Sequence, residues 1–415
     1  MNLAEELKAR GLVEHVSAPI EKILEKKRTV YFGADPSANS LHVGHLVPLL
    51  IMKRLSEDGH RIILLVGGGT GMIGDPKEKG ERPLIDTKLV EANKKALKAQ
   101  MQRIIGVKVE MVDNADWLLK VGLIEFLRDI GKHFTINELV KRDLIKRRLE
   151  DPDDSISYTE FAYSLLQGYD YLMLNQKKGA DLQVGGSDQW TNILSGVELI
   201  RRKLQKESFA FTGPIVTDTN GKKFGKSEGN AVWLDAEKTS PYAFYQFWLQ
   251  LPDEGLETYF KIYSFIPLDE IERIIREHAK NPGARSAQKT LALAMTELVH
   301  GKALAEAAAA ASGALFGDTS LSELGKEARA VVLKEAPSLP VLRKDLAKGL
   351  PVVDVLATSS LASSKSDARR LIEGNGISLN GEKVSVDQKL NESDFKEGLG
   401  LLRKGKRDVL VLVLK

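Results

Sequence analysis

The fold is decided by residues 29–66, which read TVYFGADPSANSLHVGHLVPLLIMKRLSEDGHRIILLV. Thr29–Phe32 is a short apolar run that predicts a strand, and Arg61–Val66 predicts a second one. Between them, Gly44–Ser56 has the length and apolar spacing of a helix. A strand, a helix and a strand in this order predict a βαβ unit with parallel strands. Ligands of such sheets bind at the carboxyl ends of the strands.

The same alternation continues along the first half of the chain, with one interruption. A helical stretch from about Leu123 to Asn175 separates the early units from a later one. The pattern predicts an α/β fold class built on a parallel sheet. The further elements that we expect are a helix at Thr87–Ile105, a strand at Val107–Val112, a strand at Asp181–Val184 with a turn at Gly185-Gly186, and a helix at Asp188–Leu204.

The second half of the chain predicts two further units. Ser240 before Pro241 is a typical helix start. The pattern then stays helical to about Ala311, and Ser312-Gly313 and Gly317-Asp318 are expected to break it. The last unit begins near Leu350. Its expected elements are a helix at Ser364–Glu373, a strand at Ile377–Leu379 and a hairpin turn at Asn380-Gly381.

Composition narrows the class of protein. The 415 residues suggest two or three domains, and 43% hydrophobic with 28% charged residues support a packed core. The sequence has no cysteine, which excludes disulfides, thiolate nucleophiles and cysteine-held metals. The longest apolar run, Ile62–Val66, is too short to cross a membrane, and the acidic first residues are unlike a targeting segment. We therefore expect a cytoplasmic protein without a membrane partner. A net charge of +3 is too small to predict a nucleic-acid partner.

Two separate motifs carry chemical groups suited to phosphates. His42-Val43-Gly44-His45 lies where the first helix begins, and a helix start favours anions. Alone, this motif could equally be a metal half-site or a helix cap. Residues 220–229 read NGKKFGKSEG, a glycine-rich cationic loop that could close over a polyphosphate or could be a solvated basic turn.

Together, the two motifs resemble those of class I aminoacyl-tRNA synthetases, with HVGH as the first and KFGKS as the second. KFGKS is similar to the form found in bacterial tyrosyl-tRNA synthetases. The resemblance extends over essentially the whole chain. It includes YFGADP at 31–36, GGGTGMIGDP at 67–76, YSLLQGYD at 163–170 and GGSDQW at 185–190.

This resemblance implies a domain organisation. Residues 1–220 would form a Rossmann-like catalytic domain with a helical insertion at about 115–180. The following parts would be the KFGKS loop and connector at 221–239, an all-helical anticodon-side domain at 240–320, a linker at 321–349, and a small α+β, ribosomal-protein-like RNA-binding domain at 350–415.

The resemblance also implies the reaction. The carboxylate of L-tyrosine would attack the α-phosphorus of ATP, releasing pyrophosphate, and the tyrosyl group would then move to the 3′-terminal ribose of tRNA(Tyr). A carboxylate with a pKa of about 3.5 is already ionised at neutral pH, so the first step needs no general base. Catalysis then depends on alignment and on stabilising phosphate charge. ATP is expected as a substrate together with Mg²⁺, and no metal site held by the protein is expected.

The expected site residues fall into four groups by role. Tyr31 and Asp170 would both bind the phenol hydroxyl, so that phenylalanine would leave two buried polar groups unpartnered at about 1–3 kcal/mol each. Asp188 could alternatively be a helix cap. The groups are catalytic His42, His45, Lys79, Arg82, Lys223, Lys226 and Ser227; tyrosine-binding Tyr31, Asp75, Tyr163, Gln167 and Asp170; ATP-binding Gly33, Asp35, Ser37, Gly44, Gly186, Asp188 and Gln189; and RNA-binding Arg369, Arg370, Lys404, Lys406 and Arg407.

The sequence also allows other hypotheses about the function. Gly69–Gly74 matches the dinucleotide pattern GxGxxG, but Asp75-Pro76 follows where an apolar helix start is required, which argues against an oxidoreductase. A tryptophanyl-tRNA synthetase shares the fold and both motifs. A non-catalytic RNA-binding regulator on a synthetase fold is the alternative from another class. The family resemblance also implies a homodimer, with its interface expected near Ile156–Phe161.

Overall fold

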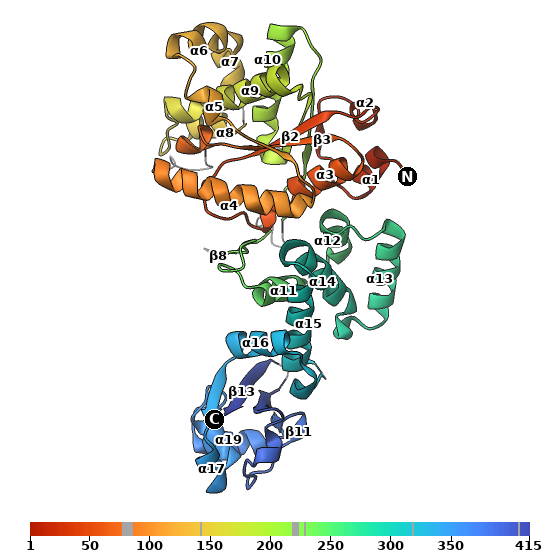
Figure 1. Ribbon diagram of the computed structural model, residues 1–415, viewed down its shortest axis with the longest axis vertical. Coiled ribbons are helices and arrows are strands. Elements are labelled where there is room, and N and C mark those ends of the chain that lie inside the picture. Colours follow the sequence, from red (N-terminus) through yellow and green to blue (C-terminus); the bar gives the residue numbers. More distant parts are fainter. Residues whose placement is uncertain (77–85, 142, 218–223, 228–229, 318, 406) are drawn as a thin grey trace. The chain divides into compact units, whose positions relative to one another are not determined.

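The computed structural model describes residues 1–76, 86–141, 143–217, 224–227, 230–317, 319–405 and 407–415 (Figure 1). The chain folds into two compact units. Unit 1 comprises Met1–Lys238 and Pro252–Pro282, and unit 2 comprises Thr239–Leu251 and Gly283–Lys415. The helical segment expected at 240–320 is therefore divided between them. Its middle part packs within unit 1, where Arg10 donates hydrogen bonds to backbone carbonyls of residues 261–266.

A six-stranded sheet forms the centre of unit 1, in the order β1-β6-β5-β2-β3-β4. All neighbouring strands are parallel except β1, which runs antiparallel to β6. The parallel sheet expected from the sequence is confirmed. The strands are β1 (His15–Val16), β2 (Thr29–Ala34), β3 (Arg61–Val66), β4 (Glu110–Asp113), β5 (Leu182–Gly186) and β6 (Phe209–Gly213).

The order of the parallel strands reverses next to β2. The chain proceeds from β2 to β3 and β4 on one side, and it returns to β5 and β6 on the other. A reversal of this kind leaves a crevice outside the carboxyl ends of the two strands that flank it. Those ends are Gly33-Ala34 in β2 and Gly185-Gly186 in β5.

Helices cover both faces of this sheet (Figure 1). α3 (Leu46–Glu57) and α4 (Thr87–Ile105) pack on one face, and α9 (Tyr158–Lys178) and α10 (Trp190–Leu204) pack on the other. The remaining helices of unit 1 are α1 (Leu3–Ala9), α2 (Ile20–Ile23), α5 (Ala115–Leu118), α6 (Leu123–Asp129), α7 (Ile136–Leu139), α8 (Asp143–Glu150), α12 (Leu256–Tyr263) and α13 (Leu268–Lys280). No helix among the described residues is long and apolar enough to span a bilayer.

Several element boundaries differ from the sequence prediction. The strand expected at Val107–Val112 begins only at Glu110, because the backbone N–H of Val109 donates to the side chain of Gln102 at the end of α4. Gly185-Gly186 is not a turn. Both glycines belong to β5, since their backbone groups pair with Thr212 and Gly213 of β6. The helix expected from Asp188 begins at Trp190, after a short 3₁₀ turn.

Unit 2 begins with helices and ends with a five-stranded sheet in the order β11-β10-β12-β13-β9. Ser240 caps α11 as expected, since its Oγ accepts a hydrogen bond from the backbone N–H of Ala243. The helices are α11 (Pro241–Leu249), α14 (Ser286–His300), α15 (Lys302–Phe316), α16 (Lys326–Glu335), α17 (Arg343–Ala347), α18 (Val352–Ala357) and α19 (Lys365–Glu373). The strands are β9 (Ser338–Val341), β10 (Ile377–Leu379), β11 (Glu382–Lys383), β12 (Leu399–Lys404) and β13 (Asp408–Leu414).

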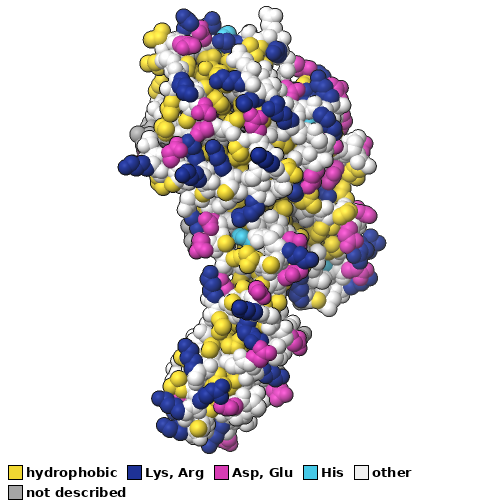
Figure 2. All heavy atoms as spheres, viewed as in Figure 1, with side chains coloured by type: hydrophobic (Ala, Val, Ile, Leu, Met, Phe, Trp, Pro, Cys, Tyr) yellow, Lys and Arg dark blue, Asp and Glu magenta, His cyan; other side chains and the backbone are white. Residues whose placement is uncertain are grey.

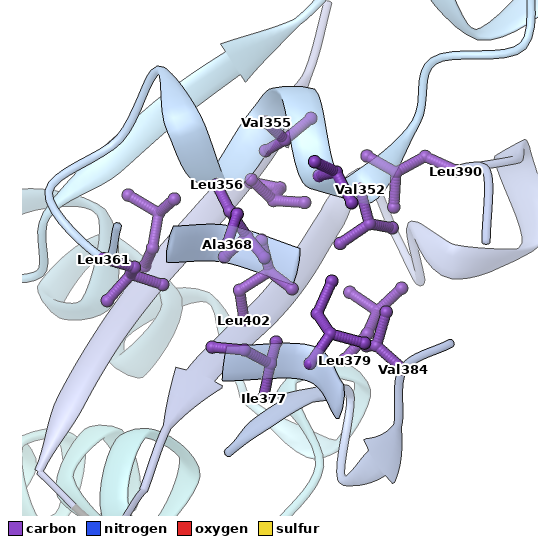
Figure 3. Close-up of a cluster of buried hydrophobic side chains, with 14 of the residues drawn as sticks. Val352, Val355, Leu356, Leu361, Ala368, Ile377, Leu379, Val384, Leu390 and Leu402 are labelled. Carbon is purple, nitrogen blue, oxygen red and sulfur yellow. The ribbon is translucent and has the colours of Figure 1, made fainter. Parts of the chain in front are cut away.

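The C-terminal sheet and the helices α18 and α19 enclose an apolar core (Figure 3). Val352 and Leu356 of α18 and Ala368 of α19 face Ile377 and Leu402 of the sheet. The expected turn at Asn380-Gly381 joins β10 and β11, and both residues have the positive φ that such a turn needs.

The sequence predicted a break at Ser312-Gly313 in the alanine-rich helix α15. This prediction was wrong, because the helix continues to Phe316. Burial of Ala311, Ala314 and Leu315 on either side of the glycine outweighs the cost of about 1 kcal/mol that a helical glycine carries.

Candidate active site

A cavity of about 530 Å³ opens at the carboxyl ends of β2 and β5. Every residue expected to bind tyrosine or ATP is described in the structure and lies in its lining, and so do both histidines of HVGH. Lys79, Arg82 and Lys223 lie outside the described residues. Lys226 and Ser227 lie in β7 (Lys226–Ser227), of which only the backbone is described. The lining residues expected from the sequence are Tyr31, Gly33, Asp35, Ser37, His42, Gly44, His45, Asp75, Tyr163, Gln167, Asp170, Gly186, Asp188 and Gln189.

The two histidines of HVGH have defined tautomers. The backbone N–H of Gly44 donates to His42 Nδ1 over 3.1 Å, and the N–H of His42 donates to His45 Nδ1 over 3.2 Å. Since Nδ1 accepts in both rings, the neutral form of each carries its proton on Nε2. The ring centroids are 4.0 Å apart. His42 thus does cap a short helical turn, and both histidines line the cavity.

The second motif packs directly against the first. β7 pairs with β8 (Asn230–Ala231), and Val232 connects the motifs: its N–H donates to the Gly225 carbonyl, and its own carbonyl accepts from Val43. Gly225 has φ +77°, and a Cβ there would lie 2.9 Å from Cβ of Val43. Only glycine fits such a position without strain. Phe224 lines the same cavity as the histidines, so the two motifs meet at one site.

Two almost fully buried polar side chains, Tyr31 and Asp170, line one part of the cavity, which we call its closed end. Tyr31 is 1% exposed, and its hydroxyl has no hydrogen-bond partner among the described residues. Asp170 is 3% exposed and accepts hydrogen bonds from Trp117 Nε1 at 2.7 Å and Asn114 Nδ2 at 2.9 Å. Burial raises the pKa of Asp170 to about 8 and that of Tyr31 well above its ordinary value. An unpaired buried hydroxyl beside a carboxyl group is suited to a ligand that carries its own hydroxyl.

A chain of hydrogen bonds links this end to Asp35 and Tyr163, which also line the cavity. Asn114 Nδ2 also donates to Thr70 Oγ1 at 2.8 Å, and Thr70 donates to Asp35 Oδ1 at 2.7 Å. The hydroxyl of Tyr163 donates to Asp35 Oδ2 at 2.7 Å. The network fixes the side chain of Asp35, which was expected on the ATP side, between Thr70 and Tyr163.

Part of the cavity lining is acidic, because it contains Asp35, Asp75 and Asp188. Asp75 accepts from Gln189 Nε2 at 2.8 Å and from Asn192 Nδ2 at 3.1 Å. Burial, together with the nearby charges of Asp35 and Asp188, raises the pKa of Asp75 to about 6. Three carboxyl groups around one space are suited to an ammonium group. Gln189 was expected to contact ATP, and in this structure its amide supports Asp75.

Four residues of these networks are absent from the sequence prediction: Thr70, Asn114, Trp117 and Asn192. Asn114 follows the carboxyl end of β4, so its place after a parallel strand was a usable signal. Trp117 lies three residues further on, and Asn192 lies in the first turn of α10 after Gln189. Neither residue could be recognised as a site residue from the sequence alone.

The cations expected to bind RNA lie in unit 2. Arg369 and Arg370 are exposed on α19, and Arg370 pairs with Asp367 at 2.6 Å. Lys404 donates to the carbonyl of Leu361 at 3.0 Å, and Arg407 is exposed. Lys406 lies outside the described residues. In the space-filling view, dark-blue Lys and Arg side chains lie over the C-terminal part, with magenta Asp and Glu side chains among them (Figure 2).

A doubly wound sheet with these two motifs meeting at its crevice defines a class I aminoacyl-tRNA synthetase. The family described as class I tRNA synthetases (W and Y) matches residues 24–317. The family described as the tyrosine–tRNA ligase SYY-like C-terminal domain matches residues 330–412. The chain belongs to the tyrosine–tRNA ligase family.

Individual relatives agree with this assignment. The chain is 46% identical to Tyrosine–tRNA ligase 2 of Enterococcus faecalis over 98% of each chain, and 41% identical to the tyrosine–tRNA ligase of Bacteroides thetaiotaomicron over 100% of each. Among solved structures, the C-terminally truncated mitochondrial tyrosyl-tRNA synthetase of Aspergillus nidulans has a TM-score of 0.66 and 33% identity. The matching part covers 74% of this chain and 92% of the Aspergillus nidulans chain. The two alternative functions, a tryptophanyl-tRNA synthetase and a non-catalytic RNA-binding regulator, are therefore not favoured.

Proposed function

We propose that the cavity joins L-tyrosine to ATP, releasing pyrophosphate, and then transfers the tyrosyl group to the 3′-terminal ribose of tRNA(Tyr). One observation carries the proposal. A closed end with an unpaired hydroxyl and a buried carboxyl group shares a cavity with two motifs suited to phosphates. The reacting carboxylate of tyrosine would lie between these two regions.

Tyrosine binds with its side chain at the closed end. Tyr31 and Asp170 bind the phenol hydroxyl, and Trp117 and Asn114 hold the carboxyl group of Asp170 in place. The ammonium group binds at Asp75, Tyr163 and Gln167. Tyr163 and Gln167 share a face of α9 with Asp170, because their spacing of four and three residues places all three on one side of the helix.

ATP binds at the open side, where β2 and β5 end. Gly33, Ser37, Gly44 and Gly186 let the nucleotide approach the backbone, and Asp188 binds its ribose. The Nε2–H groups of His42 and His45 donate to the phosphates, beside the N-terminus of α3.

The positive charge that balances the phosphates comes from Lys79, Arg82, Lys223 and Lys226, and Ser227 adds a hydroxyl group. Mg²⁺ enters with ATP as part of the substrate. Among the described residues, no group of three or more His, Asp or Glu side chains is placed to hold a metal ion. The carboxylate attacks the α-phosphorus without a general base, so the protein contributes alignment and electrostatic stabilisation.

Unit 2 binds tRNA(Tyr) through its C-terminal part. Arg369 and Arg370 on α19, together with Lys404, Lys406 and Arg407, contact phosphates. Their exposure supports this role for Arg369, Arg370 and Arg407. The reaction belongs to the cytoplasm, where charged tRNA is used.

The active protein is a homodimer. Apolar side chains are unusually exposed on α6 and its neighbours, and yellow spheres gather there in the space-filling view (Figure 2). Patches of this kind mark interaction surfaces, and a second copy of the chain is the partner that we propose. The exposed residues are Leu119, Leu123, Ile124, Leu127, Ile136 and, in the region where the interface was expected, Tyr158.

Amino-acid-dependent exchange between pyrophosphate and ATP tests the function. The purified chain should catalyse exchange with L-tyrosine and not with L-tryptophan or L-phenylalanine. Exchange with tryptophan would support the tryptophanyl alternative. Absence of exchange with any amino acid, together with tRNA binding, would support the non-catalytic regulator.

A further inference from the structure

Phe224, within the KFGKS motif, has no role in the chemistry proposed above, although it is buried beside the cavity. It is 5% exposed and lines the cavity. Its ring stacks on Tyr259 of α12, with centroids 4.7 Å apart and planes 24° apart, and it lies 5.5 Å from the ring of Tyr263. Its backbone N–H donates to the carbonyl of Val216 over 2.8 Å.

The chain just beyond Phe224 is held against the first motif. Gly225 packs on Val43, and Val232 bonds to both of them over 3.0 and 2.9 Å. β7, with Lys226 and Ser227, starts at the next residue. Gly225 alone therefore separates the stacked Phe224 from the first residue of β7.

The two tyrosines form a fixed platform. α12 ends at Tyr263, and the carbonyl of the next residue, Ser264, accepts hydrogen bonds from Arg54 Nη2 at 2.5 Å and from Arg10 Nη1 at 3.2 Å. Arg54 belongs to α3, which begins directly after His45. The platform is thus tied to the same helix that starts with the first motif.

We propose that Phe224 is a positioning residue for adenylate formation. Its stack on Tyr259 and Tyr263 fixes β7 relative to His42 and His45, so that both motifs reach the same phosphates. Aromatic pairs prefer offset-stacked or edge-to-face arrangements, and a misplacement of about 1 Å can cost about 100-fold in rate. The inference rests on the proposed function.

The test compares variants that remove a ring with variants that keep it. Phe224→Leu and Tyr259→Leu should each lower kcat of tyrosine-dependent pyrophosphate exchange by about 10- to 100-fold. The Kd of tyrosine, measured by equilibrium dialysis, should stay within about twofold, because the phenol binds at the other end of the cavity. The double variant should be no slower than the slower single variant, since both changes break the same stack.

Two controls separate positioning from general destabilisation. Tyr259→Phe keeps the ring and removes the hydroxyl that donates to the Thr217 carbonyl over 3.5 Å, so it should retain most of the activity. Phe247→Leu removes a partly buried ring that packs on Trp248 in unit 2, and it should exchange at the wild-type rate. Thermal denaturation shows whether each variant folds, and Tyr259→Leu carries the test if Phe224→Leu does not fold.

Wild-type exchange rates in the folded ring-removing variants would overturn the positioning role and leave the proposed function intact. An equal loss of tyrosine affinity, or losses that multiply in the double variant, would also overturn it. If the wild-type chain itself shows no exchange with tyrosine, the proposed function fails instead.

Discussion

Tyr31 and Asp170 constrain most strongly what the cavity can bind. Both side chains are buried, and the Tyr31 hydroxyl gives up hydration without gaining a partner among the described residues. An unpaired buried polar group costs about 1–3 kcal/mol. In the proposed function, a tyrosine substrate would remove this cost and a phenylalanine substrate would not. The pocket would then select tyrosine through the hydroxyl of Tyr31, which is left without a partner when phenylalanine binds.

Tyr31→Phe should therefore reduce selectivity without reducing stability. We expect kcat/KM for tyrosine to fall by about fivefold, corresponding to about 1 kcal/mol, while phenylalanine is used as poorly as before or slightly better. The melting temperature should stay the same or rise, because an unpartnered hydroxyl is removed. Steady-state exchange kinetics and calorimetry measure the two effects. A destabilised variant with full selectivity would contradict this reading.

Asp170 predicts a pH dependence of stability. Its pKa is raised from 3.8 to about 8 by burial, so the folded chain keeps a proton that the unfolded chain releases near pH 4. The contribution of this group to the free energy of unfolding is greatest below pH 4 and falls as the pH rises to about 8. Asp170→Asn cannot ionise, so its melting temperature relative to wild type should increase between about pH 5 and pH 8. A difference that does not change with pH would contradict the assignment.

At the scale of elements, α19 is the helix on which the RNA-binding proposal depends most. Ser364 caps it, and Ala368 (Figure 3) and Ile372 are buried in the C-terminal core, whereas Arg369 and Arg370 are exposed. The apolar face fixes the helix, and the opposite face is thereby left available for a polyanion.

Arg369→Gln should weaken tRNA binding and leave adenylate formation unchanged. Loss of one phosphate contact should reduce the slope of log K against log salt concentration by about 0.7–0.9. The matched control is Arg273→Gln, because Arg273 is exposed on α13 and pairs with Glu270. Filter binding at several salt concentrations measures the slope. Equal slopes for wild type and Arg369→Gln would show that Arg369 makes no phosphate contact.

Elements with a clear local pattern were predictable from sequence, and contacts between distant segments were not. The spacing of apolar residues and the flanking Asp86 and Gly106 set the limits of α4, and the sequence prediction matched them. Gly185-Gly186 has a local preference for a turn, but pairing with β6 overrides it. The support of Asp170 by Asn114 and Trp117 joins side chains more than fifty residues apart in the chain, so only the folded structure brings it to light.

At the scale of the whole molecule, a homodimer would cover the exposed apolar side chains of α6. Sedimentation of the wild-type chain should give twice the monomer mass of 45.8 kDa. Ile124→Asp, at a side chain that is 75% exposed, should shift the protein to the monomer mass without unfolding it. Leu304→Asp, at an exposed position of α15, should leave the mass unchanged. A monomeric wild-type chain would contradict the proposal.

In the proposed function, one cavity holds an amino acid at its closed end and a nucleotide at its open side. A crystal structure of the chain with a stable analogue of tyrosyl-adenylate would show both groups at once. The phenol hydroxyl should lie in hydrogen-bond contact with Tyr31 and Asp170, the ammonium group at Asp75, and the phosphate beside His42 and His45. An analogue bound with its phosphate at the Tyr31 end, or bound outside this cavity, would overturn the proposed function of the site.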